Sequence, residues 1–303
     1  VAALTTALPM LFRQLRRRLF GGARSLPTAR CLFDVACTTT ALPALSEVVS
    51  PNGVVRGYPQ AVANGKLAPA DLDVPLQVGR TYRVMSEQQA VFLIDVMGRG
   101  GTALPVQQVW PQWRLTPELA DLWRQAPVTV RIVLVREAGR PGEAVLFVTR
   151  LAERLADLTN GCVFDGFAER YFGPGGWQAE QRLKRVDCRE HVSLHVVGEG
   201  HGDRWLHTHG LVKFGHPEFE VYRVPVDAVK QVNSFLVDLM QYVVDGALVR
   251  PGHTLGTREA PIAAVAGRKE RAHWGSVPVL ELVDVERGRP VAGGAMRGIA
   301  ASR

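Results

Sequence analysis

The most regular alternation of apolar and polar residues begins at Val128 and predicts one β-α-β unit. Residues Val128 to Val135 are mostly apolar and β-branched on both faces, as in a central strand. A Gly-Arg-Pro-Gly turn at 139–142 is followed by apolar residues at helical spacing as far as Leu158. Asn160-Gly161 ends this helix, and Cys162 to Phe164 predicts a short returning strand.

Downstream of this unit, predicted strands are separated by turns and by one long amphipathic helix. The helix falls within residues 226–247, where apolar side chains share one face. Strands are predicted at 191–197, 205–209, 218–224 and 277–285. The predicted fold class is therefore α+β, with a mixed, largely antiparallel sheet and packed helices that include the one β-α-β unit.

Two further helices are predicted from their N-terminal signals. Ser86-Glu87-Gln88-Gln89 has the spacing of a capping box and precedes the apolar run Ala90 to Ile94, which predicts a buried helix over 87–97. Thr116-Pro117-Glu118 places a hydroxyl cap, a proline and an acid at the start of another helix that runs through Trp123.

These patterns divide the chain into four predicted parts. Residues 1–30 form a basic amphipathic leader, and residues 31–110 an N-terminal α/β region. Residues 111–287 form an α+β core domain, and residues 288–303 a flexible tail rich in glycine, alanine and arginine. The leader and the tail are expected to be loosely ordered, as chain termini usually are.

Positive charge is concentrated in the leader. The chain has 36 lysines and arginines against 29 acids, but residues 1–30 contain six arginines and no acid. The remaining 30 basic and 29 acidic residues nearly cancel, so no specific nucleic-acid partner is predicted. Arg13, Arg16, Arg17 and Arg18 form a basic patch beside helically spaced apolar residues, a pattern that can contact a membrane surface or a protein groove.

Cysteine usage and hydropathy predict a soluble protein of the cytoplasm. Cys31, Cys37, Cys162 and Cys188 contain no Cys-x-x-Cys pair, so neither a disulfide framework nor a zinc knuckle is indicated. No apolar run reaches the length of a membrane span. The leader is not a secretory signal, because arginines interrupt its apolar stretch.

Histidines are the strongest compositional anomaly, since all eight follow residue 190. His207 and His209 are two apart in a predicted strand and therefore share a face. Together they could bind one Zn²⁺, with Glu218 on the next strand as a third ligand and Glu220 or His191 as alternatives. Because His-x-His is short and common, we expect instead that the two rings do not converge with a carboxylate, and no cofactor is predicted.

Other catalytic signatures are missing from the chain. It contains neither a Walker loop nor a Gly-x-Ser-x-Gly elbow. His191-Val192-Ser193-Leu194 is one half of the paired motif of two-histidine phosphoesterases, but no second copy exists to supply the other acid–base group. The sequence therefore leans against an enzyme.

A longer motif, Thr-His-Gly-Leu-Val-Lys-Phe-Gly-His-Pro-Glu-Phe-Glu-Val, runs from Thr208 to Val221. It resembles a group of uncharacterised bacterial domains in which T-[HKR]-G is followed by F-G-x-P-E, an alternating strand, a long helix and a G-[DH]-T-[IL]-G turn, here Gly252 to Gly256. The resemblance covers about residues 128–256. It implies a bacterial α+β domain, found in some relatives near secretion or toxin and immunity systems, with no established catalytic residues.

The same segment also has a purely structural interpretation. Gly210, Gly215 and Pro217 predict a tight connection between two strands, because glycine permits positive φ and proline fixes the entry to the next strand. Glu218 and Glu220 alternate with apolar residues, which predicts one solvent face and one core face for that strand.

Two functions follow from these observations. The first is a noncatalytic intracellular binding protein, an immunity or accessory factor whose partner is another protein, with Thr208, His209, Lys213 and Glu218 lining a cleft at the strand ends. The alternative is a metal- or histidine-dependent hydrolase that uses His207, His209 and Glu218.

Overall fold

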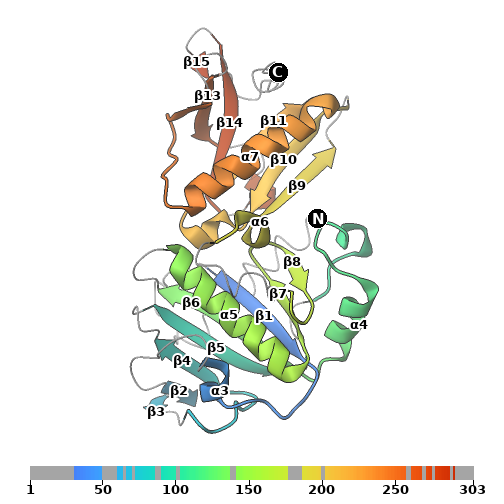
Figure 1. Ribbon diagram of the computed structural model, residues 1–303, viewed down its shortest axis with the longest axis vertical. Helices are drawn as coiled ribbons and strands as arrows, with labels where there is room; N and C mark the ends of the chain where they lie inside the picture. Colours follow the sequence, from blue (N-terminus) through green and yellow to red (C-terminus); the bar gives the residue numbers. More distant parts are fainter. Residues whose placement is uncertain are drawn as a thin grey trace. The chain divides into compact units, whose positions relative to one another are not determined.

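A computed structural model describes two compact units of the chain (Figure 1). The described residues are 31–49, 60–63, 66–69, 72–85, 90–99, 103–136 and 141–176 in the N-terminal unit, and 186–198, 202–256, 261–267, 271–274, 277–286 and 289–290 in the C-terminal unit. The predicted leader at 1–30 lies outside these ranges, as does the predicted tail apart from residues 289–290.

The N-terminal unit is built on an antiparallel sheet with the strand order β3-β2-β4-β5-β6-β1-β7-β8. Its strands are β1 (Cys31–Cys37), β2 (Gln60–Ala63), β3 (Lys66–Pro69), β4 (Thr81–Met85), β5 (Val91–Gly98), β6 (Val128–Arg136), β7 (Cys162–Asp165) and β8 (Arg170–Phe172). Its helices include α3 (Leu45–Val49), α4 (Pro117–Gln125) and α5 (Pro141–Thr159), and the short 3-10 turn η2 (Gln107–Val109) precedes α4.

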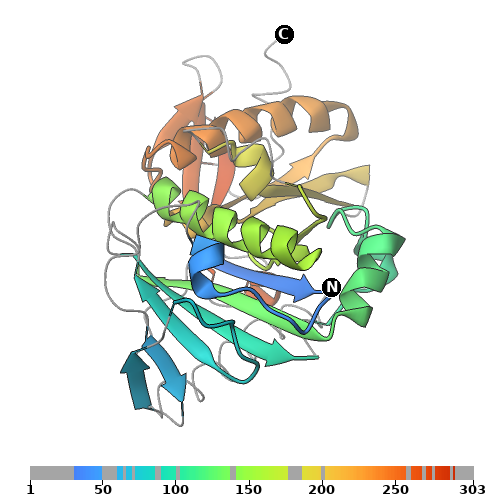
Figure 2. The same cartoon turned by 60° about the horizontal axis from the view of Figure 1, so that its bottom comes forward.

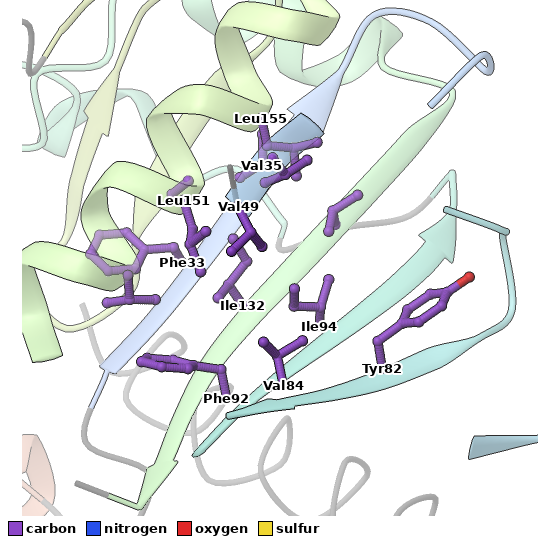
Figure 3. Packing of buried hydrophobic residues seen from close by; sticks show 14 of the residues in the cluster. Phe33, Val35, Val49, Tyr82, Val84, Phe92, Ile94, Ile132, Leu151 and Leu155 are labelled. Carbon is purple, nitrogen blue, oxygen red and sulfur yellow. The ribbon is translucent and has the colours of Figure 1, made fainter. Parts of the chain in front are cut away.

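Helix α5 covers one face of this sheet, as Figures 1 and 2 show. Leu151 and Leu155 of α5 pack with Phe33 and Val35 of β1 and with Ile132 of β6 in one buried apolar cluster (Figure 3). Because β6 and β7 both pair antiparallel with β1, they run parallel to each other, and α5 connects them. The predicted β-α-β unit is therefore present, with β1 inserted between its two strands.

The two helices that were predicted from capping signals had different outcomes. Thr116 caps α4 by accepting a hydrogen bond from the Leu119 backbone N–H, as the sequence indicates. The helix predicted over 87–97 is wrong, because Val91–Gly98 forms β5 between β4 and β6. Its apolar residues are buried on both faces, and a short run of that kind fits a central strand as well as a helix. The capping-box residues 86–89 lie outside the described residues.

The buried hydroxyl of Tyr171 in β8 is expected to contribute nothing to stability. This hydroxyl is buried among Trp113, Trp123 and Phe164 and has no hydrogen-bond partner within the described residues, and burial raises its pKa. Tyr171→Phe is therefore expected to leave the unfolding free energy unchanged or to raise it by up to about 1 kcal/mol, measured by hydrogen exchange of β7 and β8 peptides.

The matched control for Tyr171 is Tyr82→Phe in the same unit. The Tyr82 hydroxyl accepts a hydrogen bond of 3.1 Å from the Gln77 backbone N–H. Removing it is expected to cost about 1 kcal/mol. A loss for Tyr171→Phe as large as that for Tyr82→Phe would contradict the prediction.

The C-terminal unit contains a second sheet with the order β12-β13-β14-β11-β10-β9, in which β15 also pairs with β14. Only the β11–β14 pair is parallel among the described strands. The strands are β9 (Ser193–Gly198), β10 (Arg204–His209), β11 (Glu218–Val224), β12 (Thr254–Gly256), β13 (Pro261–Ala266), β14 (Val279–Glu286) and β15 (Arg289–Pro290). The helical elements are α6 (Cys188–His191), η5 (Leu211–Phe214), η6 (Val226–Ala228), α7 (Val229–Val244) and α8 (Arg271–Trp274).

Helix α7 covers one face of the second sheet (Figures 1 and 2). Its buried stripe includes Val232, Leu236 and Met240, which are the helically spaced residues of the predicted helix. Gln241 fixes α6 against it, since its side-chain amide donates to the Val186 carbonyl and its oxygen accepts from the Cys188 N–H. In the described ranges, no helix is both long and apolar enough to cross a membrane.

The α+β fold class is confirmed, but the domain boundary differs from the prediction. The sequence separates residues 31–110 from residues 111–287, whereas the units divide between the described residues 176 and 186. The reason is that β5 and β6 pair along their full lengths across the predicted boundary.

The position of His191 also differs from the prediction, which placed it in the strand at 191–197 with His195. Asp187 caps the short helix α6, and His191 lies in that helix.

Candidate metal centre

The register of the C-terminal sheet places polar side chains beside one another across four strands. His207 of β10 lies opposite His195 of β9 and Glu220 of β11, and Glu220 pairs in turn with Glu281 of β14. Directly paired residues project from the same face of a sheet. His209 projects from the same face as His207, two residues along β10.

His195, His207 and His209 form a cluster, called here the histidine cluster. One ring nitrogen from each lies within 4.8 Å of the corresponding atoms of the other two. The ring centroids are 5.4 Å apart for His195 and His207, 4.6 Å for His195 and His209, and 5.1 Å for His207 and His209. All three side chains are largely buried, with His209 the most accessible at 9% exposed.

Two tryptophans and a fourth histidine border the cluster. Trp205 lies against His207 with ring centroids 3.9 Å apart, and Trp274 lies 5.1 Å from His209. His273 belongs to α8, which lies in the chain between β13 and β14, and its Nε2 atom is 3.4 Å from Nε2 of His209. These aromatic rings shield the cluster from bulk water.

Glu220 holds Trp274, one of the aromatic rings that border the cluster, in place. Its Oε2 atom accepts a hydrogen bond of 2.9 Å from Trp274 Nε1 and one of 2.7 Å from the Tyr222 hydroxyl. The carboxylate is fully buried, and a Cβ added at Gly267 would come within 2.6 Å of Oε1. Position 267 therefore needs a glycine, because a larger residue would displace the group that holds Trp274.

Burial holds the imidazoles of His207 and His209 in the neutral form. Burial is the largest cause that lowers the pKa of His207, and together with the neighbouring His195 and His273 it brings the pKa to about 2. The pKa of His209 is lowered well below its usual value for the same reasons, with burial as the largest cause. Neutral imidazole carries the lone pair that binds a metal ion.

Glu218 lies outside the cluster, although the sequence named it as a third ligand. Its Oε2 accepts from the Thr208 hydroxyl at 2.7 Å, while Oε1 accepts from the backbone N–H groups of Gly210 and Val212. Its carboxylate therefore holds the β10–β11 connection together. The third imidazole comes instead from His195, which lies in the strand predicted at 191–197.

Of the predicted cleft residues, Thr208 and Glu218 are brought together by a hydrogen bond, whereas His209 lies in the histidine cluster, and the four do not line an open cleft. Thr208, Lys213 and Glu218 are 0–2% exposed, and Thr208 also accepts a hydrogen bond from the Phe219 N–H. The prediction of a tight connection holds, since Gly210 and Gly215 both have positive φ. The predicted solvent face of β11 is wrong, because Glu218 and Glu220 are both buried by the turn and by α8.

Sequence reasoning missed the parts of the site that depend on long-range pairing. The glycines after residue 197 indicate a hairpin, but His195 joins His207 only through the β9–β10 register, which the turn residues do not specify. His273 lies 64 residues beyond His209, and no periodicity connects them. His253 is exposed, and the basic patch of Arg13, Arg16, Arg17 and Arg18 lies outside the described residues.

Comparisons of the chain with protein-family models, with curated proteins and with solved structures found no match. The resemblance of residues 128–256 to uncharacterised bacterial domains therefore stays a prediction. The geometry of the site is therefore what bears on the function.

Proposed function

We propose that the C-terminal unit binds a transition-metal ion through His195, His207 and His209, and that the protein is a noncatalytic metal-binding protein. The observation that carries this proposal is the convergence of three imidazoles from two adjacent strands, with one ring nitrogen of each within 4.8 Å of the others. This keeps the intracellular binding role predicted from the sequence, as an accessory factor, and gives that role a ligand.

The cluster is difficult to explain as ordinary packing. Burying a polar group without a partner costs on the order of 1–3 kcal/mol, and Nδ1 of His207 is buried without a hydrogen-bond partner among the described residues. A metal ion would offset this cost, because it accepts the lone pair of a neutral ring.

The donor set favours a borderline divalent cation. Imidazole nitrogens suit Zn²⁺, Co²⁺, Ni²⁺ and Cu²⁺, whereas Mg²⁺ and Ca²⁺ prefer oxygen ligands. The nearest carboxylates do not change this preference, because Glu220 bonds Trp274 and Tyr222 while Glu218 bonds the turn. Zn²⁺ and Co²⁺ are therefore the probes of choice.

Zn²⁺ and Co²⁺ are expected to bind the full-length protein with one ion per chain, measured by isothermal titration calorimetry and metal analysis. His207→Ala and His209→Ala are expected to weaken binding by at least about 10- to 100-fold, because each removes one nitrogen ligand. At a free metal concentration of 100 times Kd, binding should add about 2.7 kcal/mol to the stability of the C-terminal unit.

His253→Ala is the matched control for these variants. His253 is exposed and lies outside the cluster, so its loss should leave the affinity unchanged. Equal binding by wild type, His207→Ala and His253→Ala would refute the proposal.

A metal-dependent hydrolase is the second candidate function, favoured by one observation. Three protein ligands leave a fourth position that water can occupy, as in catalytic zinc sites. The zinc-loaded protein would then hydrolyse an activated phenyl ester faster than the same concentration of free Zn²⁺. Equal rates, together with stoichiometric binding, would favour the binding role.

A further inference from the structure

We infer that His273 is the fourth ligand of the proposed site and closes its coordination sphere, so that the bound ion has four imidazole ligands and no bound water. This inference rests on the proposed function, because it requires that the histidine cluster binds a metal ion. It names a residue from α8, which lies outside both the β9–β10 hairpin and the group of three histidines whose ring nitrogens are within 4.8 Å of one another.

The Nε2 atoms of His273 and His209 lie 3.4 Å apart. Two nitrogens at 2.0–2.1 Å from a tetrahedral zinc ion are separated by about 3.4 Å. The two rings therefore already have the spacing of ligands that share one tetrahedral ion.

A direct hydrogen bond explains this spacing less well. An N–H donor usually lies about 2.9–3.0 Å from its acceptor, which is shorter than the distance observed here. Such a bond would also leave Nδ1 of His207 buried without a hydrogen-bond partner among the described residues. A shared ion uses the facing nitrogens of His209 and His273 together.

The position of His273 is fixed through its neighbour in the chain. Trp274 is anchored by its indole N–H to the buried carboxylate of Glu220, and its ring lies against His209. Because His273 precedes Trp274 in the four-residue helix α8, this anchor holds its imidazole beside the cluster. The ring centroid of His273 is 5.0 Å from that of His207 and 5.4 Å from that of His209.

A closed sphere of four nitrogens determines what the site can do. Structural zinc sites have four protein ligands, whereas catalytic sites keep one position for water or substrate. With His273 bound, the ion cannot activate a water molecule. Such a site can store or sense a borderline divalent ion, or use the ion to stabilise the fold, but it cannot catalyse hydrolysis.

The test uses Co²⁺ absorption spectra of the full-length protein, with sodium azide as a probe for an open position. The wild-type Co²⁺ protein is expected to show intense tetrahedral bands that azide does not change. His273→Ala is expected to bind Co²⁺ at least about tenfold more weakly and to acquire an azide-sensitive spectrum. Added imidazole should restore the wild-type bands, and His253→Ala should behave as wild type.

The outcomes separate this inference from the proposed function. Absence of Co²⁺ binding by the wild-type protein would overturn both. Stoichiometric binding with azide-sensitive bands in the wild-type protein would overturn the role of His273 alone, and this measurement does not depend on the folding of a variant. Identical affinity and spectra for wild type and His273→Ala would also overturn it.

Discussion

Arg131→Met is expected to lower the unfolding free energy of the N-terminal unit by about 3–5 kcal/mol. Arg131 of β6 makes a bidentate ion pair with Asp34 of β1, with distances of 2.6 and 2.7 Å, and both side chains are almost fully buried. Burial alone lowers the pKa of Arg131, but the charges of Asp34 and Asp95 and the hydrogen bond to Asp34 raise it overall. The substitution leaves the Asp34 carboxylate buried without its cationic partner.

Hydrogen exchange of β1 and β6 peptides measures this loss within the N-terminal unit. The matched control is Arg124→Met in α4, where the pair with Asp121 has more than half of each side chain exposed. An exposed pair contributes about 0–1 kcal/mol, so the control should change little. The double variant Asp34→Leu with Arg131→Met should recover part of the loss, because it removes both buried charges. Similar losses for Arg131→Met and Arg124→Met would contradict the prediction.

The second large effect is the pH dependence contributed by Glu218. Burial raises the pKa of Glu218, hydrogen bonds from Thr208 and the backbone of residues 210–212 lower it, and the net result is a rise from 4.5 to about 7. The folded protein therefore holds a proton on Glu218 that the unfolded chain loses near pH 4.5. As the pH rises from 4.5 to 7, the contribution of Glu218 to stability falls by about 3 kcal/mol, and above pH 7 the loss is complete.

Glu218→Gln tests this pH dependence because glutamine does not titrate. The stability of wild type relative to Glu218→Gln is expected to fall by about 3 kcal/mol between pH 4.5 and pH 8, measured by hydrogen exchange of β10 and β11 peptides. Values at pH 4.5 and below serve as the internal reference, since Glu218 is then largely protonated in the folded state. A difference that stays constant, or that rises with pH, would contradict the raised pKa.

Local signals predicted the fold where burial and period agree. The strand Val128 to Val135 and the helix after it were recognisable because β-branched residues and helical spacing coincide with their places in the core. Val91–Gly98 was assigned to a helix because a run buried on both sides has no period. The position of β1 between β6 and β7 could not be predicted either, because Asp34 and Arg131 are 97 residues apart.

The candidate site shows the same limit. His207 and His209 are brought together by the two-residue period of one strand, which the sequence displays directly. Glu218, the candidate carboxylate ligand, does not reach the cluster, because the backbone N–H groups of the turn bond it. His195 and His273 join the cluster through strand register and through the Glu220–Trp274 hydrogen bond, and neither feature leaves a local pattern in the sequence.

The insertion of β1 between β6 and β7 determines when the N-terminal sheet can form during synthesis. β1 is made first of its strands, yet the residue that pairs with Asp34 follows 97 positions later. At about 5–20 residues per second, β1 waits roughly 5–20 s for β6 and longer for β7. Neighbouring hairpins such as β7–β8 close without such a delay. Until β6 is made, the apolar β1 segment has both edges unpaired, and unpaired strand edges of this kind are prone to aggregate.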